Sequence, residues 1–263
     1  MKLVLDVGNT RIKWRMGSAS GETVHVRGGW EAQLLGAWRA LPEPDALVVG
    51  SVASEALNQA LEDCVRRIWP RVERVWLRSR AAWCGVRIQY VEPARFGVDR
   101  FAGLVAAHTE FPERALAVVD VGTAVTVDML DATGVHRGGV IMPGVRLLQS
   151  SLASGAAKLA GSQRPASLRV CEPQNETCLA MAAGVCCMLQ GGVLKALEQG
   201  VSVTGGSRAE VILCGGDAAY LDEAMFTQQG WMVHRRATLV LDGLERMFEC
   251  MGKGGVALVN ELS

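Results

Sequence analysis

A strand that runs into an Asp-x-Gly turn occurs twice in this chain, and this repeat constrains the fold more than any other feature. The first copy begins at Lys2 and ends in Asp6-Val7-Gly8-Asn9-Thr10. The second copy, 114 positions later, begins at Ala117 and ends in Asp120-Val121-Gly122-Thr123-Ala124. A β-rich run that ends in an acid, a glycine and small polar residues is typical of a strand and a tight turn. The chain therefore indicates an internal duplication.

A second strand follows each turn. In the first copy apolar Ile12, Trp14 and Met16 alternate with basic Arg11, Lys13 and Arg15; in the second Val125, Val127 and Met129 alternate with Thr126 and Asp128. This period of two is typical of a strand with one covered face. At a constant offset of 114 Lys13 aligns with Val127, so the pattern predicts opposite phases for the two second strands.

Further strands and helices follow in each copy, and this order favours mixed α/β domains over an all-parallel Rossmann sheet. A chain of 263 residues suits two domains of roughly 120 residues each. The boundary is expected near Tyr90 to Arg100, giving domains at 1–96 and 97–263. The expected strands are Thr23 to Arg27, Ala46 to Val49, Val135 to Met142 and Glu210 to Cys214, and the expected helices are Glu31 to Ala40, Glu55 to Ile68, Asp99 to Glu110, Val145 to Leu159, Glu176 to Glu198, Ala218 to Met225 and Leu239 to Met251.

Composition narrows the class of ligand. The 27 basic and 27 acidic residues cancel and form no basic stripe interleaved with aromatic residues, so a small ligand is favoured over nucleic acid. The longest apolar runs fall short of the ~18 residues of a membrane span, which predicts a cytoplasmic protein without a membrane partner. Eight scattered cysteines and four distant histidines predict reduced, buried thiols and no zinc site.

The Asp-x-Gly-x-Thr pattern suits phosphate binding for simple physical reasons. Glycine lets the backbone approach a ligand, turn N–H groups and hydroxyls donate to phosphate oxygens, and the acid holds a hydrated cation. Asp6, Gly8, Asn9 and Thr10 fit this pattern, and Lys13 can reach a phosphate from the second strand. One such hairpin alone is equally compatible with an ordinary turn, and the second copy shifts the balance towards a nucleotide site.

No standard nucleotide loop competes with these turns. Gly252-Lys253-Gly254 lacks the upstream glycine and the following Ser or Thr of a Walker A loop, and no G-x-G-x-x-G opens a helix. Gly215-Gly216-Asp217 follows a strand, which suits either close approach to a nucleoside or an ordinary strand-to-helix turn.

The segment from Tyr90 to Phe101 is the most informative stretch outside the repeat. Pro93 and Gly97 indicate a loop, and Asp99 then stands at the start of a helix beside Arg100. On these residues alone Asp99 is better explained as an N-cap, which stabilises a helix by about 1 kcal/mol.

Three motifs in this order resemble those of one family. Asp6 to Thr10 is similar to the first phosphate motif of type III pantothenate kinases, Gly97-Val98-Asp99-Arg100 to their Gly-x-Asp-Arg motif, and Asp120 to Ala124, with Thr126 and Asp128, to their second phosphate motif. Weaker agreements are Gly138-Gly139, Pro143-Gly144, Asn175 to Thr177, Gly215-Gly216 and Leu241 to Leu244. The resemblance extends along essentially the whole chain.

The resemblance implies an α/β protein of two actin-like (ribonuclease H-like) domains, each a mixed five-stranded sheet flanked by helices, with a nucleotide cleft between them. It implies ATP-dependent phosphorylation of the pantothenate primary hydroxyl to 4'-phosphopantothenate, the first step of coenzyme A biosynthesis, by a cytoplasmic homodimer. It also implies Mg²⁺ with ATP and a monovalent cation, K⁺ or NH₄⁺, at Asp120.

The same resemblance assigns the site residues. It implies that ATP is bound by Asp6, Val7, Gly8, Asn9, Thr10, Arg11, Ile12, Lys13 and Thr123. It implies that Asp99 is the general base, and that the pantothenate pocket is lined by Tyr90, Gly97, Val98, Asp99 and Arg100, with Thr177 contributed across the dimer interface.

Two other functions fit parts of the sequence. A regulatory protein can keep an actin-like nucleotide cleft and act by binding a partner, because such folds host several functions. Intact Asp6, Asp99, Arg100 and Asp120 argue against a pure binding module, which needs no base beside a phosphate site. A kinase for another small alcohol is the second alternative.

Overall fold

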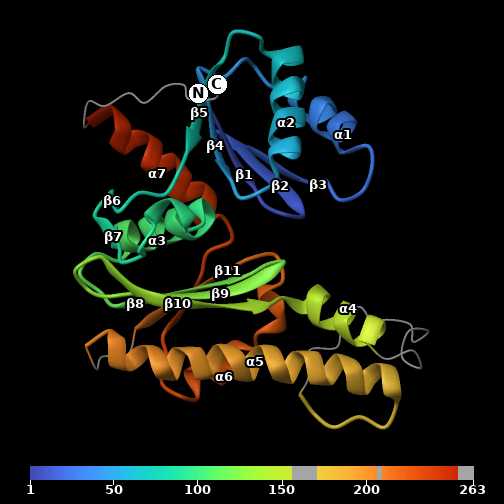
Figure 1. Ribbon diagram of the computed structural model, residues 1–263, viewed down its shortest axis with the longest axis vertical. Coiled ribbons are helices and arrows are strands. Elements are labelled where there is room, and N and C mark those ends of the chain that lie inside the picture. The colour runs from blue at the N-terminus through green and yellow to red at the C-terminus, as the bar shows by residue number, and fades with distance from the viewer. Residues whose placement is uncertain (156–170, 206–208, 254–263) are drawn as a thin grey trace. The chain divides into compact units, whose positions relative to one another are not determined.

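A computed structural model describes residues 1–155, 171–205 and 209–253 of the chain (Figure 1). Two compact units result: unit 1 contains Met1–Thr109 and the segment that starts at Thr238, and unit 2 contains Glu110–Ala237. These units are groupings by contact, and the division into domains at residue 96 stays a prediction.

Unit 1 is built on a mixed sheet with strand order β3-β2-β1-β4-β5. Its strands are β1 (Lys2–Val7), β2 (Arg11–Met16), β3 (Ala19–Val24), β4 (Ala46–Ser51) and β5 (Glu73–Leu77), and its helices are α1 (Trp30–Trp38), α2 (Glu55–Ile68), α3 (Val98–Glu110) and α7 (Leu239–Lys253). The hairpin of β6 (Ala82–Trp83) and β7 (Val86–Ile88) and the 3-10 helix η1 (Pro93–Arg95) precede α3. β1 pairs antiparallel with β2 and parallel with β4.

Helices cover both faces of this sheet. Alternate β1 residues Leu3, Leu5 and Val7 pack into one apolar cluster with residues of α1 and α2. Figure 1 shows α7 on the opposite face. This alternation follows from the period of two in a strand, and it places Lys2, Val4 and Asp6 on the α7 side.

Unit 2 repeats the strand order of unit 1. Its strands are β8 (Leu116–Val121), β9 (Ala124–Leu130), β10 (Val135–Pro143), β11 (Glu210–Cys214) and β12 (Val233–Arg235). They follow the order β12-β11-β8-β9-β10, with β8 antiparallel to β9 and parallel to β11. The duplication inferred from two turns therefore extends to the path of the chain through both sheets.

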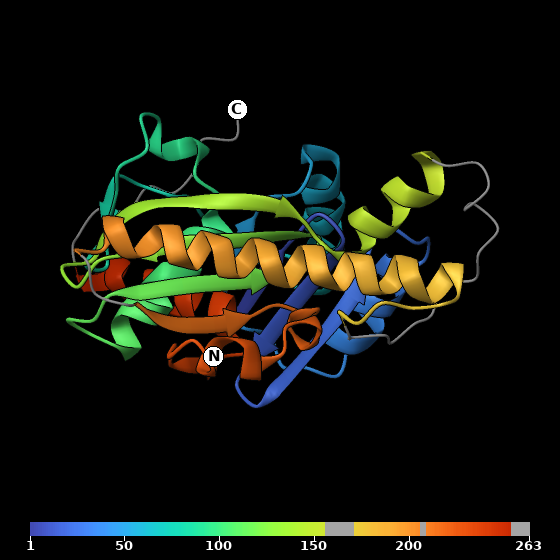
Figure 2. The same cartoon turned by 90° about the horizontal axis from the view of Figure 1, so that it is seen from below.

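The long helix α5 (Thr177–Val203) covers one face of the unit 2 sheet, as Figure 2 shows. Its apolar residues Val185, Leu189, Val193 and Leu197 are buried in one cluster with residues of β8 and β9. The other helices of this unit are α4 (Val145–Gly155), the 3-10 helix η2 (Ala218–Tyr220) and α6 (Glu223–Thr227).

The second strands of the two copies have the same phase, so the expected opposite phase is wrong. Asp6 pairs across its hairpin with Lys13, whereas Asp120 pairs with Thr126. The offset between copies therefore falls from 114 before the turn to 113 after it, because the second turn is one residue shorter. A one-residue slip moves every side chain to the other face. Aligning the two copies at a constant offset of 114 therefore concealed the residue that is missing from the second turn.

Several other expectations are corrected. The strand expected at Thr23 to Arg27 is β3, which begins at Ala19 after a tight turn with Gly17 at φ 57°. The helix expected over Ala218 to Met225 is two short elements, because Leu221 is extended and the Asp222 side chain caps α6. Residues 156–159 of the helix expected from Val145 lie outside the described residues.

The expectation for membranes was also incomplete. Among the described residues α5 is long and apolar enough to cross a membrane by length and composition, and 33% of its most apolar stretch is buried. Gly, Thr and Gln residues break up its apolar run without adding charge, so a search for unbroken apolar runs missed it.

The eight cysteines are free. Cys64, Cys186 and Cys214 are buried as expected, whereas Cys84, Cys178 and Cys250 are half-buried and Cys171 and Cys187 are exposed.

Helix α7 returns from the end of the chain to complete unit 1. Its Leu244 fills the space above Gly50 of β4, where an added Cβ would lie 2.4 Å from a Leu244 methyl carbon. Gly243 lies against the backbone of Ala102 in α3. Close packing of this kind requires glycine where two backbones meet.

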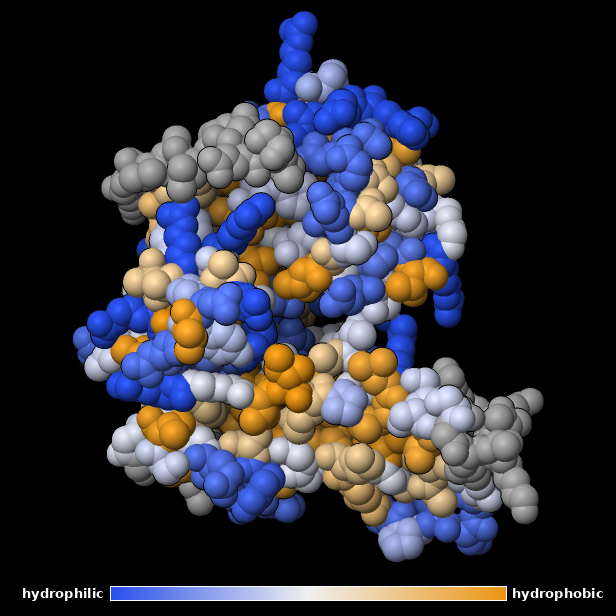
Figure 3. All heavy atoms as spheres, viewed as in Figure 1, coloured by the Kyte–Doolittle hydropathy of each residue, from blue (hydrophilic) through white to orange (hydrophobic). Residues whose placement is uncertain are grey.

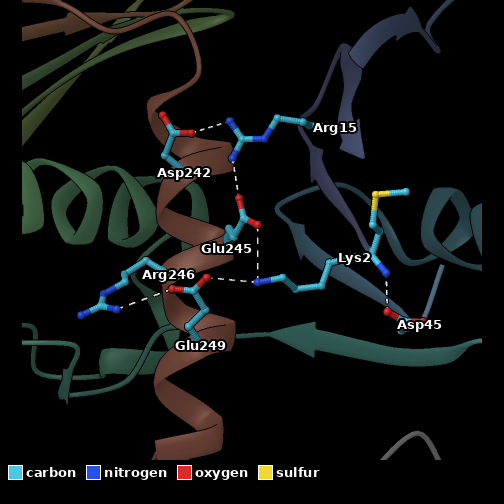
Figure 4. Close-up of polar contacts among 8 residues, drawn as sticks. Lys2, Arg15, Asp45, Asp242, Glu245, Arg246 and Glu249 are labelled. Carbon is cyan, nitrogen blue, oxygen red and sulfur yellow. Dashed lines mark hydrogen bonds and ion pairs between the residues drawn. The ribbon is translucent and has the colours of Figure 1, made fainter. Parts of the chain in front are cut away.

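Ion pairs line the contact of α7 with β1 and β2, as Figure 4 shows. Lys2 Nζ lies 3.1 Å from Glu249 Oε1 and 3.4 Å from Glu245 Oε1, and Arg15 Nη2 lies 2.8 Å from Glu245 Oε2. The hydrogen bond from Lys2 lowers the pKa of Glu249 below its ordinary value. Such partly exposed pairs contribute about 0–1 kcal/mol each, so they orient the helix while its apolar face supplies most of the stability.

Gly243→Ala is expected to destabilise the protein. A Cβ there would lie 1.9 Å from the Ala102 carbonyl oxygen, and overpacking of this kind costs about 1–3 kcal/mol in the free energy of unfolding. Urea denaturation measures the change. Gly252→Ala is the matched control, because it lies in the same helix with no atom within 4 Å of its Cβ position. Equal stabilities for the two variants would contradict the packing role of Gly243.

Candidate phosphate-binding and catalytic residues

The turn between β1 and β2 is closed by its own backbone and supported by two other segments. The Gly8 N–H donates to the Arg11 carbonyl oxygen at 3.0 Å. Beyond β3, the His25 N–H donates to the Thr10 carbonyl oxygen, and the His25 ring Nε2 lies 2.8 Å from the Gly8 carbonyl oxygen. The turn at Asp6 therefore has a fixed shape before any ligand arrives. Sequence reasoning assigned no role to His25, which stands just after the expected repeat.

A pocket of about 380 Å³ opens beside this turn within unit 1. Polar and apolar groups share its lining: Asn9, His25, Trp30, Glu31, Ala53, Ser54, Ala56, Leu57 and Ala60. Ser54 caps α2 by accepting a hydrogen bond from the Leu57 N–H. The N-terminus of α2 thus borders a pocket that contains both Asn9 of the turn and the Glu31 carboxylate.

Lys13 stands directly across the hairpin from Asp6. The two residues are Cα partners in the antiparallel register of β1 and β2, and directly opposed residues of a pair share one face of the sheet. A cationic ammonium and a carboxylate thus stand on one face at the end of β1, as a site for phosphate and its cation requires.

The segment before α3 places Asp99 over a glycine. α3 begins at Val98, so Asp99 lies inside the first turn and not at the N-cap. Its Oδ1 accepts a hydrogen bond from the Arg100 N–H at 2.7 Å and lies 2.5 Å from the Cβ position of Gly97. A side chain at position 97 would therefore displace the carboxylate, which explains the glycine.

The backbone at Gly97 lies near Val52, a residue that contacts the phosphate turn. The Val52 side chain lies 3.7 Å from the Cβ position of Gly97, and the Val52 N–H donates to the Val7 carbonyl oxygen at 3.0 Å. Unit 1 therefore connects its Asp-x-Gly turn to its Gly-x-Asp-Arg segment through the residue that follows β4. Sequence reasoning missed Val52, because a lone valine after a strand carries no local signal.

Phe96 is a second residue that sequence reasoning missed. Its ring packs edge to face with Tyr90, with centroids 5.0 Å apart, and the Arg100 guanidinium lies 4.4 Å from the ring centroid. Phe96 is 2% exposed, so it anchors both neighbours while Tyr90 remains 39% exposed. The signal was present, since a large aromatic side chain in a loop of Pro and Gly is commonly an anchor.

In unit 2 the second Asp-x-Gly turn is held by three remote contacts. The Asp217 N–H donates to the Val121 carbonyl oxygen at 2.9 Å, and the Gly144 N–H donates to the Thr123 carbonyl oxygen at 3.1 Å. Gly215, with φ 97°, lies so close that an added Cβ would meet the Val121 carbonyl oxygen at 2.3 Å and Asp120 Oδ1 at 2.5 Å. The glycines at positions 144 and 215 are thus needed for packing against this turn.

Asp128 and His136 form a buried pair in the same unit. The His136 Nε2 lies 2.9 Å from Asp128 Oδ1, and both side chains are 1% exposed. The pair joins β9 to β10 beside a register shift between His136 and Gly138. Asp128 of the second motif therefore has a structural partner inside unit 2.

The predicted site residues fall into two groups. The whole segment from Asp6 to Lys13, Tyr90 and the segment from Gly97 to Arg100 belong to unit 1, whereas Asp120, Thr123 and Thr177 belong to unit 2. Thr177 is the first residue of α5 and is exposed. Among the described residues no cluster of three His, Cys, Asp or Glu side chains could hold a metal ion, so a cation bound here would also need backbone, ligand or water oxygens.

Comparison with known proteins identifies the family. The family model for type III pantothenate kinases matches residues 2–199. The chain belongs to the type III pantothenate kinase family. A relative of that name from Alkalilimnicola ehrlichii is 37% identical over 254 residues, covering 93% of this chain and 96% of the relative. Another from Burkholderia mallei is 32% identical over 254 residues, covering 93% of this chain and 97% of the relative.

Solved structures confirm the predicted fold class. An archaeal actin homolog, Ta0583, gives a TM-score of 0.54 at 12% identity, covering 94% of this chain and 99% of the homolog. A putative 2-dehydro-3-deoxygalactonokinase from Sinorhizobium meliloti gives a TM-score of 0.53 at 16% identity, covering 97% of this chain and 100% of that protein. The chain thus has the actin-like, sugar-kinase fold that its resemblance to the family implied.

Gly215→Ala is expected to weaken nucleotide binding. The added methyl group would displace Asp120 and Val121, and its φ of 97° is unfavourable for any side chain. Calorimetric titration with a non-hydrolysable ATP analogue should show a loss of about tenfold or more, for which 1.4 kcal/mol suffices. Gly36→Ala, at an exposed position of α1, has no atom within 4 Å of its Cβ position and should bind as the parent protein does. Unchanged affinity in Gly215→Ala would show that this turn does not contribute to the nucleotide site.

Proposed function

We propose that this protein transfers the γ-phosphoryl group of ATP to the primary hydroxyl of pantothenate, giving 4'-phosphopantothenate in the first step of coenzyme A biosynthesis. The observation that carries the proposal is family membership over nearly the whole chain. The Asp99 carboxylate lies over Gly97, and the Gly97 backbone lies near Val52, which donates to the first phosphate turn; both observations support the proposal.

In this proposal the segment Asp6 to Lys13, together with Thr123, binds ATP. The β1–β2 turn is held by its own hydrogen bonds, so it pays little conformational entropy when a phosphate binds. Lys13, directly opposite Asp6 in the register, supplies positive charge to the phosphates. Because the transition state of phosphoryl transfer is loose, such positioning and charge neutralisation provide most of the catalysis.

Asp99 acts as the general base for the hydroxyl of the substrate. The Asp99 Oδ1 accepts the hydrogen bond from the Arg100 N–H, which orients the carboxylate. In a loose transition state the proton leaves late, so a carboxylate of ordinary basicity suffices. Gly97 leaves the space in which this carboxylate lies.

Pantothenate carries a carboxylate, an amide and an alcohol, and the charged end is the part for which the proposed pocket has an obvious partner. Arg100 can pair with the carboxylate through its planar guanidinium, and stacking on Phe96 limits the orientations of that side chain. Tyr90, Gly97 and Val98 line the same pocket. Thr177, exposed at the start of α5, contributes from the partner subunit.

The donors near Asp120 fit hard cations. The Asp120 carboxylate and the carbonyl oxygens of Gly122 and Thr123 are all oxygen donors close to the second turn, and K⁺, NH₄⁺ and Mg²⁺ prefer oxygen ligands or acceptors. We assign the monovalent cation to Asp120 and Mg²⁺ to the phosphates of ATP. When bound, these cations neutralise the charge of the phosphates.

We infer a homodimer from the exposed face of α5. Residues Ala180, Gly184, Cys187, Met188 and Gly191 follow one another along this face and are exposed, and Met188 is 63% exposed. Leu147 and Leu152 of the neighbouring helix α4 are 45% and 37% exposed. Figure 3 shows hydrophobic side chains gathered where α4 and α5 lie in Figure 1. An apolar face of this kind suits a second copy of the chain.

Further along α5 the exposed residues change to Lys195, Glu198 and Gln199. The apolar face therefore ends within the helix, a pattern that favours a bounded protein interface over a membrane span. A cytoplasmic location agrees with the use of ATP and stays part of the proposal.

The two alternative functions predict different patterns of ATP consumption. A regulatory protein that only binds nucleotide would consume no ATP in the presence of pantothenate, and a kinase for another alcohol would consume ATP with that alcohol. An assay of ATP consumption with pantothenate, glycerol and sugars separates the three functions. Turnover with pantothenate alone supports the proposal, and any other result contradicts it.

Asp99→Asn is expected to fold normally and to lose about 10²–10⁴-fold in turnover, the range that a general base contributes. Asn keeps an oxygen that can accept the Arg100 N–H but cannot accept the substrate proton. Asp222→Asn is the matched control, because Asp222 caps α6 by accepting from the Ala224 N–H, a purely local role. Near-parental turnover in Asp99→Asn would disprove the base assignment.

Activity is expected to require K⁺ or NH₄⁺, because Na⁺ is smaller and prefers shorter distances to its oxygen ligands than these two cations do. Steady-state rates in matched potassium, ammonium and sodium buffers measure this requirement. In Asp120→Asn the concentration of K⁺ that gives half-maximal rate should rise. Full activity in sodium buffer, or an unchanged K⁺ response in Asp120→Asn, would refute the assignment.

A further inference from the structure

Two cysteines far apart in the sequence meet within unit 1. Cys84 lies in the turn between β6 and β7, and Cys250 lies in α7. The Cys84 Sγ lies 4.0 Å from the Arg246 carbonyl oxygen, the carbonyl that a helix pairs with the N–H four residues on, at Cys250. Cys250 stands one helical turn after Arg246, and it lies near enough to Cys84 to raise the pKa of that thiol. Figure 1 shows the β6–β7 hairpin beside α7.

The backbone at Cys84 is unusual for cysteine. Trp83 pairs with Val86, so Cys84 and Gly85 form a two-residue hairpin loop, with φ 51° and 83°. Positive φ at both positions is typical of a type I′ turn, which favours Asn-Gly or Asp-Gly. A cysteine in a left-handed conformation costs of order 1 kcal/mol and supplies none of the local hydrogen bonds of Asn. The thiol is therefore explained by its contact with α7 and not by the turn.

The two thiols are accessible to a small oxidant, because both side chains are half-buried. Burial raises the pKa of the Cys84 thiol, the neighbouring Cys250 acts in the same direction, and the positive charge of Arg246 acts in the opposite one.

We propose that Cys84 and Cys250 are a redox-active pair that forms a reversible disulfide with hydrogen peroxide. One of the two sulfurs attacks the O–O bond, giving a sulfenic acid and one water. The other sulfur then attacks the sulfenic sulfur and releases a second water as the S–S bond forms. The two thiols lose two hydrogens and two electrons, and peroxide is reduced to water. A dithiol reductant reverses the bond by exchange.

The disulfide would connect two functional parts of unit 1. β7 ends at Ile88, two residues before Tyr90 and the segment that leads to Gly97. α7 carries the ion pairs to β1 and β2. A covalent bond between the β6–β7 turn and α7 would hold the start of the Tyr90 segment against the helix and restrict its motion. Formation of the disulfide between Cys84 and Cys250 does not depend on whether the protein phosphorylates pantothenate.

Peptide mapping after peroxide treatment of the whole protein tests the pair. A crosslinked peptide that contains Cys84 and Cys250, lighter by two hydrogens and lost on addition of a dithiol, is expected. Hydrogen exchange should slow in residues 86–97 of the oxidised form. Cys84→Asn should remove the crosslink and this slowing while keeping the midpoint of thermal unfolding at or above that of the reduced parent, because Asn suits the turn.

Controls keep the result specific. Cys250→Ala should also remove the crosslink, and Cys178→Ser, which changes a half-buried cysteine in the other unit, should leave it intact. If Cys84 and Cys250 of the parent protein remain free under peroxide, or if crosslinks form only among Cys171, Cys186 and Cys187, the proposal is overturned. Both of these contradicting results would be seen in the parent protein, so the test does not depend on whether any variant folds.

Discussion

Main-chain hydrogen bonds from neighbouring parallel strands set the shape of both Asp-x-Gly turns, and the predicted nucleotide site depends on them. In unit 1 the donor is the Val52 N–H after β4, and in unit 2 it is the Asp217 N–H after β11. Each reaches the carbonyl oxygen of the valine that follows the aspartate. The turns are therefore fixed by the sheet, and a ligand meets donors and carboxylates already in place.

The sequence predicted much of this because the controlling signals are local. A strand followed by Asp, Gly and small polar residues can be recognised within ten positions, and the order of three motifs predicted the family and the fold class correctly. The one-residue deletion in the second turn shows the limit of the same method. Only the strand register, with Lys13 opposite Asp6 and Thr126 opposite Asp120, showed that the two copies share one phase.

Features that depend on distant contacts could not be predicted in this way. Gly243 faces Ala102, and Cys84 faces Cys250, yet no local pattern marks either pair. The role of Phe96 depends on its contacts with Tyr90 and Arg100, and the sequence shows neither contact. The roles of the site residues stay proposals, since residues of one kind can bind, orient or merely pack, and their chemistry is decided by measurement.

The return of α7 to unit 1 has a consequence for synthesis of the chain on the ribosome. Unit 2 is one continuous stretch, whereas unit 1 needs residues from before Thr109 and after Thr238. While the chain emerges, the face of the unit 1 sheet that later receives Leu244 and the ion pairs of α7 has no cover. The earlier-made half of unit 1 must therefore wait for the last helix, and unit 2 can complete its core first. Loss of α7 by premature termination would accordingly damage the part of the protein that was made first.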